Sequence, residues 1–174
     1  MSEQHYHAST YTAQSSIGYL IKRSHAMLMD MLENLFADRG FSFIHYAILT
    51  YVRDGIAVNP KDICVLYRHD SGALTRVIDH LEERGLLERV RRGNDRRKVE
   101  LELTDEGRKT VESLIPLVVD KLNLALVDFS RDEVAEFKRL LVKLNTRLTA
   151  TLDPKTAAEK TAAEAKSAAV GTES

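Results

Sequence analysis

The sequence has a single cysteine and no long apolar run, and these shortages exclude several classes of protein. Cys64 is alone among 174 residues, which rules out an internal disulfide framework and fits a reducing cytoplasm. No stretch of about 18 apolar residues is present, and the first residues, M-S-E-Q-H-Y-H, lack the basic start and apolar block of a secretion signal. We therefore expect a soluble, cytoplasmic protein.

Residue patterns for catalysis or metal binding are also missing. The six histidines are scattered without the paired spacing of a zinc site, so we expect no metal and no cofactor. No nucleophile has an evident base beside it, and no glycine-rich phosphate-binding loop is present. The sequence therefore predicts a protein that is not an enzyme.

Positive charge is concentrated in one stretch, although the formal net charge of the chain is -1. The residues from Arg84 to Lys98 include seven basic side chains against two acidic ones. Salt screens charges over about 8 to 10 Å, so a phosphate beside this stretch would respond to it and not to the net charge.

The first half of the chain predicts three helices. Residues 14–37 place apolar side chains at spacings of three and four, which indicates a long helix that buries one face. Ser42 is expected to begin a second helix that stops at Gly55, and Asn59 with Pro60 to begin a short third one. The long helix carries more apolar surface than a small core needs.

A fourth helix should be capped by Asp70 and end at Gly85. Its apolar stripe is Ala73, Leu74, Val77, Ile78 and Leu81. Its opposite side carries Ser71, Thr75, Arg76, Asp79 and Glu83, polar groups that no core would select. Residues 86–90 and 98–103 predict two strands, and Gly93 with Asn94 suits the hairpin tip between them.

Two further helices and a tail complete the chain. Thr104 is expected to cap a fifth helix that contains Pro116, and Ser130 with Glu133 forms a capping box for a sixth. Residues 153–174 are alanine, lysine, glutamate, threonine and serine with almost no large apolar side chain, which predicts a disordered or transiently helical low-complexity tail.

A helix pair followed by a hairpin with a basic tip fits a winged helix-turn-helix that binds duplex DNA. The polar face of the fourth helix suits the major groove, and arginines at the hairpin tip suit a narrow minor groove. The expected DNA contacts are Ser71, Gly72, Thr75, Arg76, Arg91, Arg92, Asp95, Arg96 and Arg97. Asp95 is expected to hold the Arg97 guanidinium, and the alternative is an ordinary turn residue. The alternative for the whole stretch is a solvated run of charge.

The run D-S-G-A-L-T-R-V-I-D-H-L-E-E-R-G-L-L-E-R, followed by N-D-R-R-K-V-E-L-E-L-T-D-E-G, resembles the MarR (multiple antibiotic resistance regulator) family of transcriptional regulators. The most diagnostic part is the D-x-R of Asp95 and Arg97 with the later L-x-L-T-x-x-G that ends at Gly107. The resemblance covers residues 15–150, and residues 1–14 are expected to be a flexible N-terminus.

The resemblance implies a mainly α fold with a small β-hairpin wing in an interdigitated helical homodimer. Residues 15–40 and 104–150 would supply the dimerisation helices, and residues 55–103 the DNA-binding lobe. Two-fold symmetry then predicts a pseudo-palindromic operator with half-sites about one helical turn apart. The implied function is a repressor that a small aromatic or phenolic compound releases from DNA.

The resemblance also implies an effector site between the dimerisation helices and the DNA-binding lobe. The candidate ligand-binding residues are Tyr19, Arg23, His25, His45 and Tyr46. An arginine and a histidine could neutralise a carboxylate while tyrosines and apolar walls hold a ring. Each has another interpretation: Arg23 as a salt bridge of the dimer, and either histidine as a satisfied interface residue.

Three alternatives remain open from the sequence. Cys64 could sense oxidants, but between Ile63 and Leu66 it most resembles a small packing residue. The winged helix could be a protein-protein interaction module that never meets DNA. It could also be a dimerisation domain attached to an enzyme.

Overall fold

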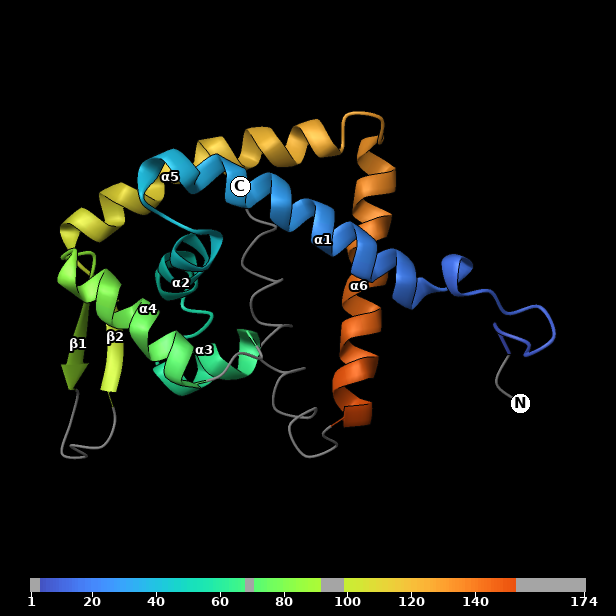
Figure 1. Cartoon of the computed structure of the whole chain (residues 1–174), viewed down its shortest axis with the longest axis horizontal. Helices are drawn as coiled ribbons and strands as arrows, with labels where there is room; N and C mark the ends of the chain where they lie inside the picture. The colour runs from blue at the N-terminus through green and yellow to red at the C-terminus, as the bar shows by residue number, and fades with distance from the viewer. Residues whose placement is uncertain (1–3, 68–70, 92–98, 153–174) are drawn as a thin grey trace. The chain divides into compact units, whose positions relative to one another are not determined.

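The computed structural model describes residues 4–67, 71–91 and 99–152, and it is mainly helical with one two-stranded sheet (Figure 1). The elements are α1 (Ile17–Phe36), α2 (Phe43–Arg53), α3 (Pro60–Tyr67), α4 (Ser71–Glu83), β1 (Leu87–Arg91), β2 (Val99–Leu103), α5 (Asp105–Ala125) and α6 (Arg131–Leu152). This order of elements confirms the predicted mainly α fold with a small β-hairpin. The chain forms two compact units, Met1–Leu124 and Ala125–Ser174.

Local capping explains where the helices begin and end. The Ser16 hydroxyl accepts the Tyr19 amide at 3.2 Å, so α1 begins at Ile17 and not at residue 14 as expected. The Asn59 side chain accepts the Asp62 amide at 2.9 Å and starts α3. Gly55 and Gly85 adopt left-handed φ angles of 65° and 67°, which ends α2 and α4 as predicted.

One apolar cluster joins α2, α3, α4 and the hairpin within the first unit. Its largest fully buried side chains are Ile48, Leu49, Ile63, Leu74, Ile78, Leu81, Leu101 and Val111. Ala73 was expected in the apolar stripe of α4 but is exposed, since the buried positions begin at Leu74. The cluster fixes α4 on its apolar side and leaves its other side to solvent.

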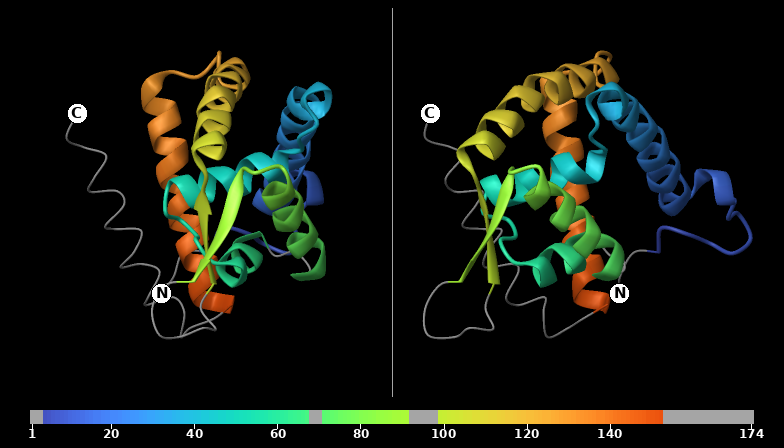
Figure 2. Two further views of the ribbon diagram at one scale, coloured as in Figure 1. Left: turned by 90° about the vertical axis from the view of Figure 1, so that its left-hand side faces the viewer. Right: turned by 60° about the vertical axis from the view of Figure 1, so that its left-hand side comes forward.

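The hairpin is antiparallel, with Leu87 opposite Leu103 and Arg91 opposite Val99. Figure 1 shows the two strands side by side, and Figure 2 shows the same hairpin from two other directions. The Leu101 amide donates to the Val58 carbonyl at 2.6 Å, so the loop before α3 adds a further backbone bond beside β2. The base of the predicted wing is therefore attached to the apolar cluster.

A second cluster joins the C-terminal half of α1 to α5 through Leu32, Phe36, Leu114 and Val118. The N-terminal half of α1 differs from expectation, because its apolar face is not covered. Ile17, Leu20 and Ile21 are 51%, 51% and 40% exposed. Periodicity correctly identifies the face as apolar but does not specify what covers it.

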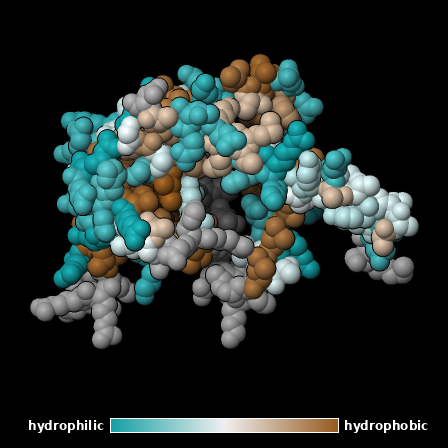
Figure 3. Space-filling model, viewed as in Figure 1, coloured by the Kyte–Doolittle hydropathy of each residue, from teal (hydrophilic) through white to brown (hydrophobic). Residues whose placement is uncertain are grey.

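The second unit consists, in its described part, of the end of α5, a connection and α6. The Ser130 amide donates to the Glu133 carboxylate at 2.8 Å and the Ser130 hydroxyl accepts the Glu133 amide at 3.2 Å, which confirms the predicted capping box. No residue of α6 is buried, and Phe137, Leu140 and Leu148 are nearly half exposed. Figure 3 shows this hydrophobic surface along α6 and at the connection before it.

Candidate nucleic-acid interface and effector pocket

The outward side of α4 presents polar groups on a rigidly held helix. Leu74, Ile78 and Leu81 are almost completely buried, and they fix the rotation of α4 about its axis. Gly72, Thr75 and Arg76 are exposed, and Ser71 is the first residue of the helix. The fold therefore brings three of the predicted DNA contacts, Gly72, Thr75 and Arg76, to one exposed stretch of helix.

Arg89 connects α4 to β1. Its guanidinium donates to Asp79 at 2.6 Å and also pairs with Glu82, both on α4. From the sequence, Arg89 belongs to the basic stretch and Asp79 to the polar outer face of α4. In the structure the two side chains form an ion pair, which sets the orientation of α4 against the hairpin.

Arg84 is also committed within the protein. It donates to the Gly40 carbonyl at 2.7 Å, and its guanidinium carbon lies 4.1 Å from the centre of the Phe41 ring. Two of the seven basic residues between Arg84 and Lys98, namely Arg84 and Arg89, therefore make contacts within the protein. Arg91, at the end of β1, is exposed, and its contact with DNA stays a prediction.

The other predicted wing contacts, Arg92, Asp95, Arg96 and Arg97, lie outside the described residues, as does the predicted cap Asp70. Their role in binding DNA stays a prediction of the sequence.

A pocket of about 550 Å³ opens between α1, α2 and α3, a volume suited to a small organic ligand. Its described lining is His25, Met29, Glu33, Phe43, Ile44, Tyr51, Leu66 and Tyr67. Of the five ligand-binding residues predicted from the sequence, His25 alone belongs to this lining. Tyr51, Tyr67 and Glu33 were missed, since the first was assigned to the core and the others carried no motif.

Two tyrosines form adjoining walls of this pocket. The rings of Tyr51 and Tyr67 are 6.3 Å apart between centroids and inclined at 58°. Burial raises the pKa of both phenols, and with the added effects of Tyr51 and Glu33 the pKa of Tyr67 reaches about 12. Both phenols are therefore neutral hydrogen-bonding groups at physiological pH.

His45 has a structural role in the described fold. Its Nδ1 accepts the Ser42 amide at 3.0 Å and lies 2.6 Å from the Ser42 hydroxyl, completing a capping box at the start of α2. Its ring lies 5.2 Å from the His80 ring of α4. Burial, then His80 and Arg84, lowers the pKa of His45, while Glu33 opposes this shift. The S-x-x-H spacing was the signal that could have identified this cap.

The remaining three predicted ligand residues lie elsewhere in the first unit. The Tyr46 ring stacks on Phe36 at 5.4 Å in the second apolar cluster. Tyr19 is half-buried near the start of α1, and Arg23 is exposed one turn later. Their part in binding an effector stays a prediction.

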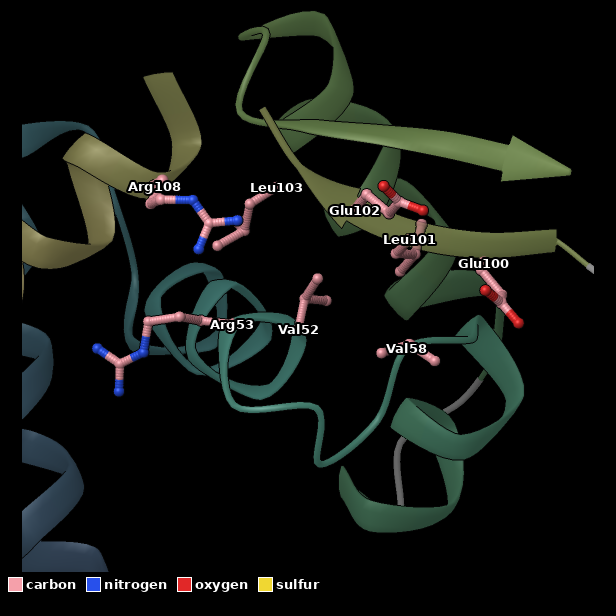
Figure 4. Close-up of a pocket in the computed structure, with 8 residues that line it drawn as sticks. All are labelled: Val52, Arg53, Val58, Glu100, Leu101, Glu102, Leu103 and Arg108. Atoms are coloured by element: carbon pink, nitrogen blue, oxygen red, sulfur yellow. The ribbon is translucent and has the colours of Figure 1, made fainter. Parts of the chain in front are cut away.

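A smaller pocket of about 300 Å³ lies at the base of the hairpin (Figure 4). Arg53 and Arg108 line one end, and Val58 and Glu100 the other. Arg53 donates to its neighbour Asp54 at 2.7 Å. Because its charges are of both signs and one arginine is already paired, this pocket offers no single preferred ligand charge.

Among the described residues, no three histidine, cysteine, aspartate or glutamate side chains gather in a way that could hold a metal. Within the same residues, no helix has the length and hydrophobicity needed to cross a bilayer. Cys64 is half-buried against the first apolar cluster.

Comparison with known proteins agrees with this arrangement. A family model described as MarR family matches residues 39–98. The multiple antibiotic resistance protein MarR of Escherichia coli (strain K12) is 33% identical over 100 residues, which are 57% of this chain and 69% of that protein. The chain belongs to the MarR family.

One further relative and one solved structure extend the comparison. The HTH-type transcriptional repressor YetL of Bacillus subtilis (strain 168) is 28% identical over 120 residues, covering 68% of this chain and 72% of YetL. A crystal structure of a cysteine-to-serine variant of E. coli MarR complexed with operator DNA matches with a TM-score of 0.64 and 28% identity, covering 74% of this chain and 92% of that one. MarR proteins are DNA-binding transcriptional regulators and not enzymes, as the sequence predicted.

Proposed function

We propose that this MarR-family regulator is a homodimeric repressor that leaves its operator when a small aromatic compound binds. The observation that carries the DNA-binding part is the exposed face of α4. Thr75 and Arg76 face solvent while Leu74 and Ile78 lock the opposite side into the core. An arginine held on a rigid helix suits a base edge in the major groove.

Exposed apolar helix faces support the homodimer. The first unit exposes Ile17, Leu20 and Ile21 on α1, and the second exposes Phe137 and Leu140 on α6. Removing apolar surface of this kind from water is favourable by about 25 cal/mol for each Å². A second copy presents the same faces, and a two-fold pair of α4 helices fits a pseudo-palindromic operator.

The pocket between α1, α2 and α3 supports release by an effector. It lies between α1, an expected dimerisation helix, and α3, which packs against α4 in the first apolar cluster. A compound that binds better to a conformation in which the two DNA-binding lobes are spaced wrongly for DNA would shift the equilibrium away from the DNA-bound form. YetL and E. coli MarR carry repressor and operator-binding descriptions that agree with this proposal.

The DNA-binding proposal is tested by fluorescence anisotropy with the DNA upstream of the protein's own gene and with a scrambled duplex of equal length. We expect the upstream DNA to bind at least about a thousandfold tighter at physiological salt. Equal binding to both duplexes, or no binding at low salt, would contradict the proposal and favour a protein-protein interaction module.

The homodimer is tested by sedimentation velocity of the wild type and of Leu20→Asp. The wild type should sediment as a dimer, and Leu20→Asp should be folded by circular dichroism but shifted to monomer. Lys22→Asp, on the same helix, is the matched control and should stay dimeric. A monomeric wild type at working concentration would refute this part.

A further inference from the structure

The pocket between α1, α2 and α3 has an unusual charge content for a site expected to hold aromatic acids. Among its described lining residues there is one carboxylate, Glu33, and neither lysine nor arginine. Arg23, the residue expected to neutralise an acid, is exposed and does not belong to this lining. Besides Glu33 and the two tyrosines, the described lining residues include one further ionisable group, His25.

Glu33 is held in place by the protein itself. Its Oε2 accepts the Phe43 amide at 3.0 Å, at the N-terminal end of α2. This bond fixes one oxygen of the carboxylate at the pocket. The negative charge of Glu33 acts on two neighbouring groups: it raises the pKa of Tyr67, and it opposes the lowering of the pKa of His45.

Aromatic faces surround the same space. Phe43, Tyr51 and Tyr67 contribute three rings, and the inclined pair of tyrosines can contact a ligand from two directions. The face of an aromatic ring attracts a cation and repels an anion. Because burial raises the pKa of both phenols, they add no negative charge to the pocket.

We propose that this pocket selects aromatic compounds that carry a positive charge, such as aryl-alkyl amines or quaternary ammonium compounds, over aromatic acids. The Glu33 carboxylate and three aromatic rings attract the cation, and the apolar side chains of Met29, Ile44 and Leu66 pack against the rest of the ligand. The inference rests on the proposed function only for its regulatory meaning, because the preference for charge is a property of the pocket alone.

Three ligands of similar shape test the charge preference by isothermal titration calorimetry: 1-naphthylmethylammonium, 1-naphthylmethanol and 1-naphthylacetate. An ion pair and cation–π contacts at a partly open site predict that the cation binds about tenfold tighter than the alcohol. The acid should bind more weakly than the alcohol. Tightest binding by naphthylacetate, or no saturable binding by any of the three, would overturn the proposal.

Two variants assign the preference to this pocket. Glu33→Gln keeps an oxygen that can accept the Phe43 amide but removes the charge, so the tenfold advantage of the cation should disappear. Glu112→Gln, an exposed position of α5 outside the lining, should leave it unchanged. Leu66→Arg, at a position that is 40% exposed, should weaken the cation and strengthen the acid. Unchanged preference in both Glu33→Gln and Leu66→Arg would refute the assignment.

Operator binding in the presence of each ligand separates this inference from the proposed function. If the cation binds with the expected preference but leaves DNA affinity unchanged, the pocket inference stands and release by this site fails. If naphthylacetate binds tightest through the same pocket and releases DNA, the proposed function stands and the charge inference fails.

Discussion

The backbone carbonyl of Leu86 occupies the space that a side chain on Gly107 would need. Gly107 lies in the first turn of α5, where helix propensity alone would favour alanine. We expect Gly107→Ala to reduce the free energy of unfolding by about 1 to 3 kcal/mol, because the backbone must move to admit the methyl group. Urea unfolding followed by circular dichroism measures the loss.

Gly18→Ala is the matched control for this change. Gly18 also lies in the first turn of a helix, but apart from its chain neighbours and the backbone of its own helix, no atom lies within 4 Å of the position of its missing Cβ. The alanine should be neutral or stabilise by up to about 1 kcal/mol. Equal effects of the two substitutions would show that the contact with Leu86 is not what requires Gly107.

The ion pairs of Arg89 with α4 predict a separation of stability from DNA binding. Arg89 and Asp79 are 34% and 45% exposed, so Arg89→Ala should cost at most about 1 kcal/mol of stability. Operator affinity should fall further, because α4 loses the contact that orients it against the hairpin. Anisotropy with operator and scrambled duplexes, beside urea unfolding, measures both effects.

Arg139 provides the comparison for Arg89, since it makes two hydrogen bonds of 2.7 Å with Glu136 on the exposed surface of α6. Arg139→Ala should leave operator affinity unchanged. If Arg89→Ala also leaves operator affinity unchanged, the ion pairs of Arg89 with Asp79 and Glu82 do not place α4 for DNA binding.

Much of the fold follows from local signals in the sequence. Thr104 illustrates this: its hydroxyl accepts the Gly107 amide at 2.9 Å and donates to the Gly85 carbonyl at 2.6 Å, and the first of these bonds is the predicted cap. Such caps involve neighbouring residues, so spacing is enough to find them. The second bond crosses nineteen positions of the chain and could not be predicted from spacing.

The pocket shows where prediction from sequence is limited. Glu33 and Tyr67 are far apart in the chain and carry no motif, and only the folded arrangement of α1, α2 and α3 brings them to one pocket. Tyr51 was predicted to face inward, which is correct, but an inward tyrosine can line a cavity as well as fill a core. His45 was assigned by chemical type to a ligand site, while its hydrogen bond to Ser42 gives it a capping role.

The capping role of His45 predicts a dependence of stability on pH. Only the unprotonated Nδ1 can accept the Ser42 amide, and burial lowers the pKa of the folded state below 6.5. The unfolded chain then binds more protons in that window, so stability is complete above about pH 6.5 and is lost as pH falls through the folded-state pKa. Urea midpoints at pH 7.5 and 5.5 should show the decrease.

His45→Gln supplies a capping acceptor that does not titrate, so it should reduce the difference between the two pH values. His7→Gln removes an exposed histidine and should leave the wild-type difference intact. A pH dependence that survives in His45→Gln would assign the effect to other groups, of which His80 is the nearest imidazole.

Arg76 and Arg91 should contribute to DNA binding in different ways because they lie on different elements. Arg76 is exposed on α4, and Arg76→Ala should lower operator affinity by about 1 to 3 kcal/mol while binding to scrambled DNA changes little.

Arg91 is exposed at the end of β1, and Arg91→Ala should weaken binding to the operator and to the scrambled duplex alike and lower the salt slope by about one. Lys143→Ala on α6 is the control for loss of a positive charge and should change neither quantity. Equal losses on both duplexes for Arg76→Ala would remove it from the residues that read sequence, and an unchanged slope for Arg91→Ala would place the hairpin away from the phosphates.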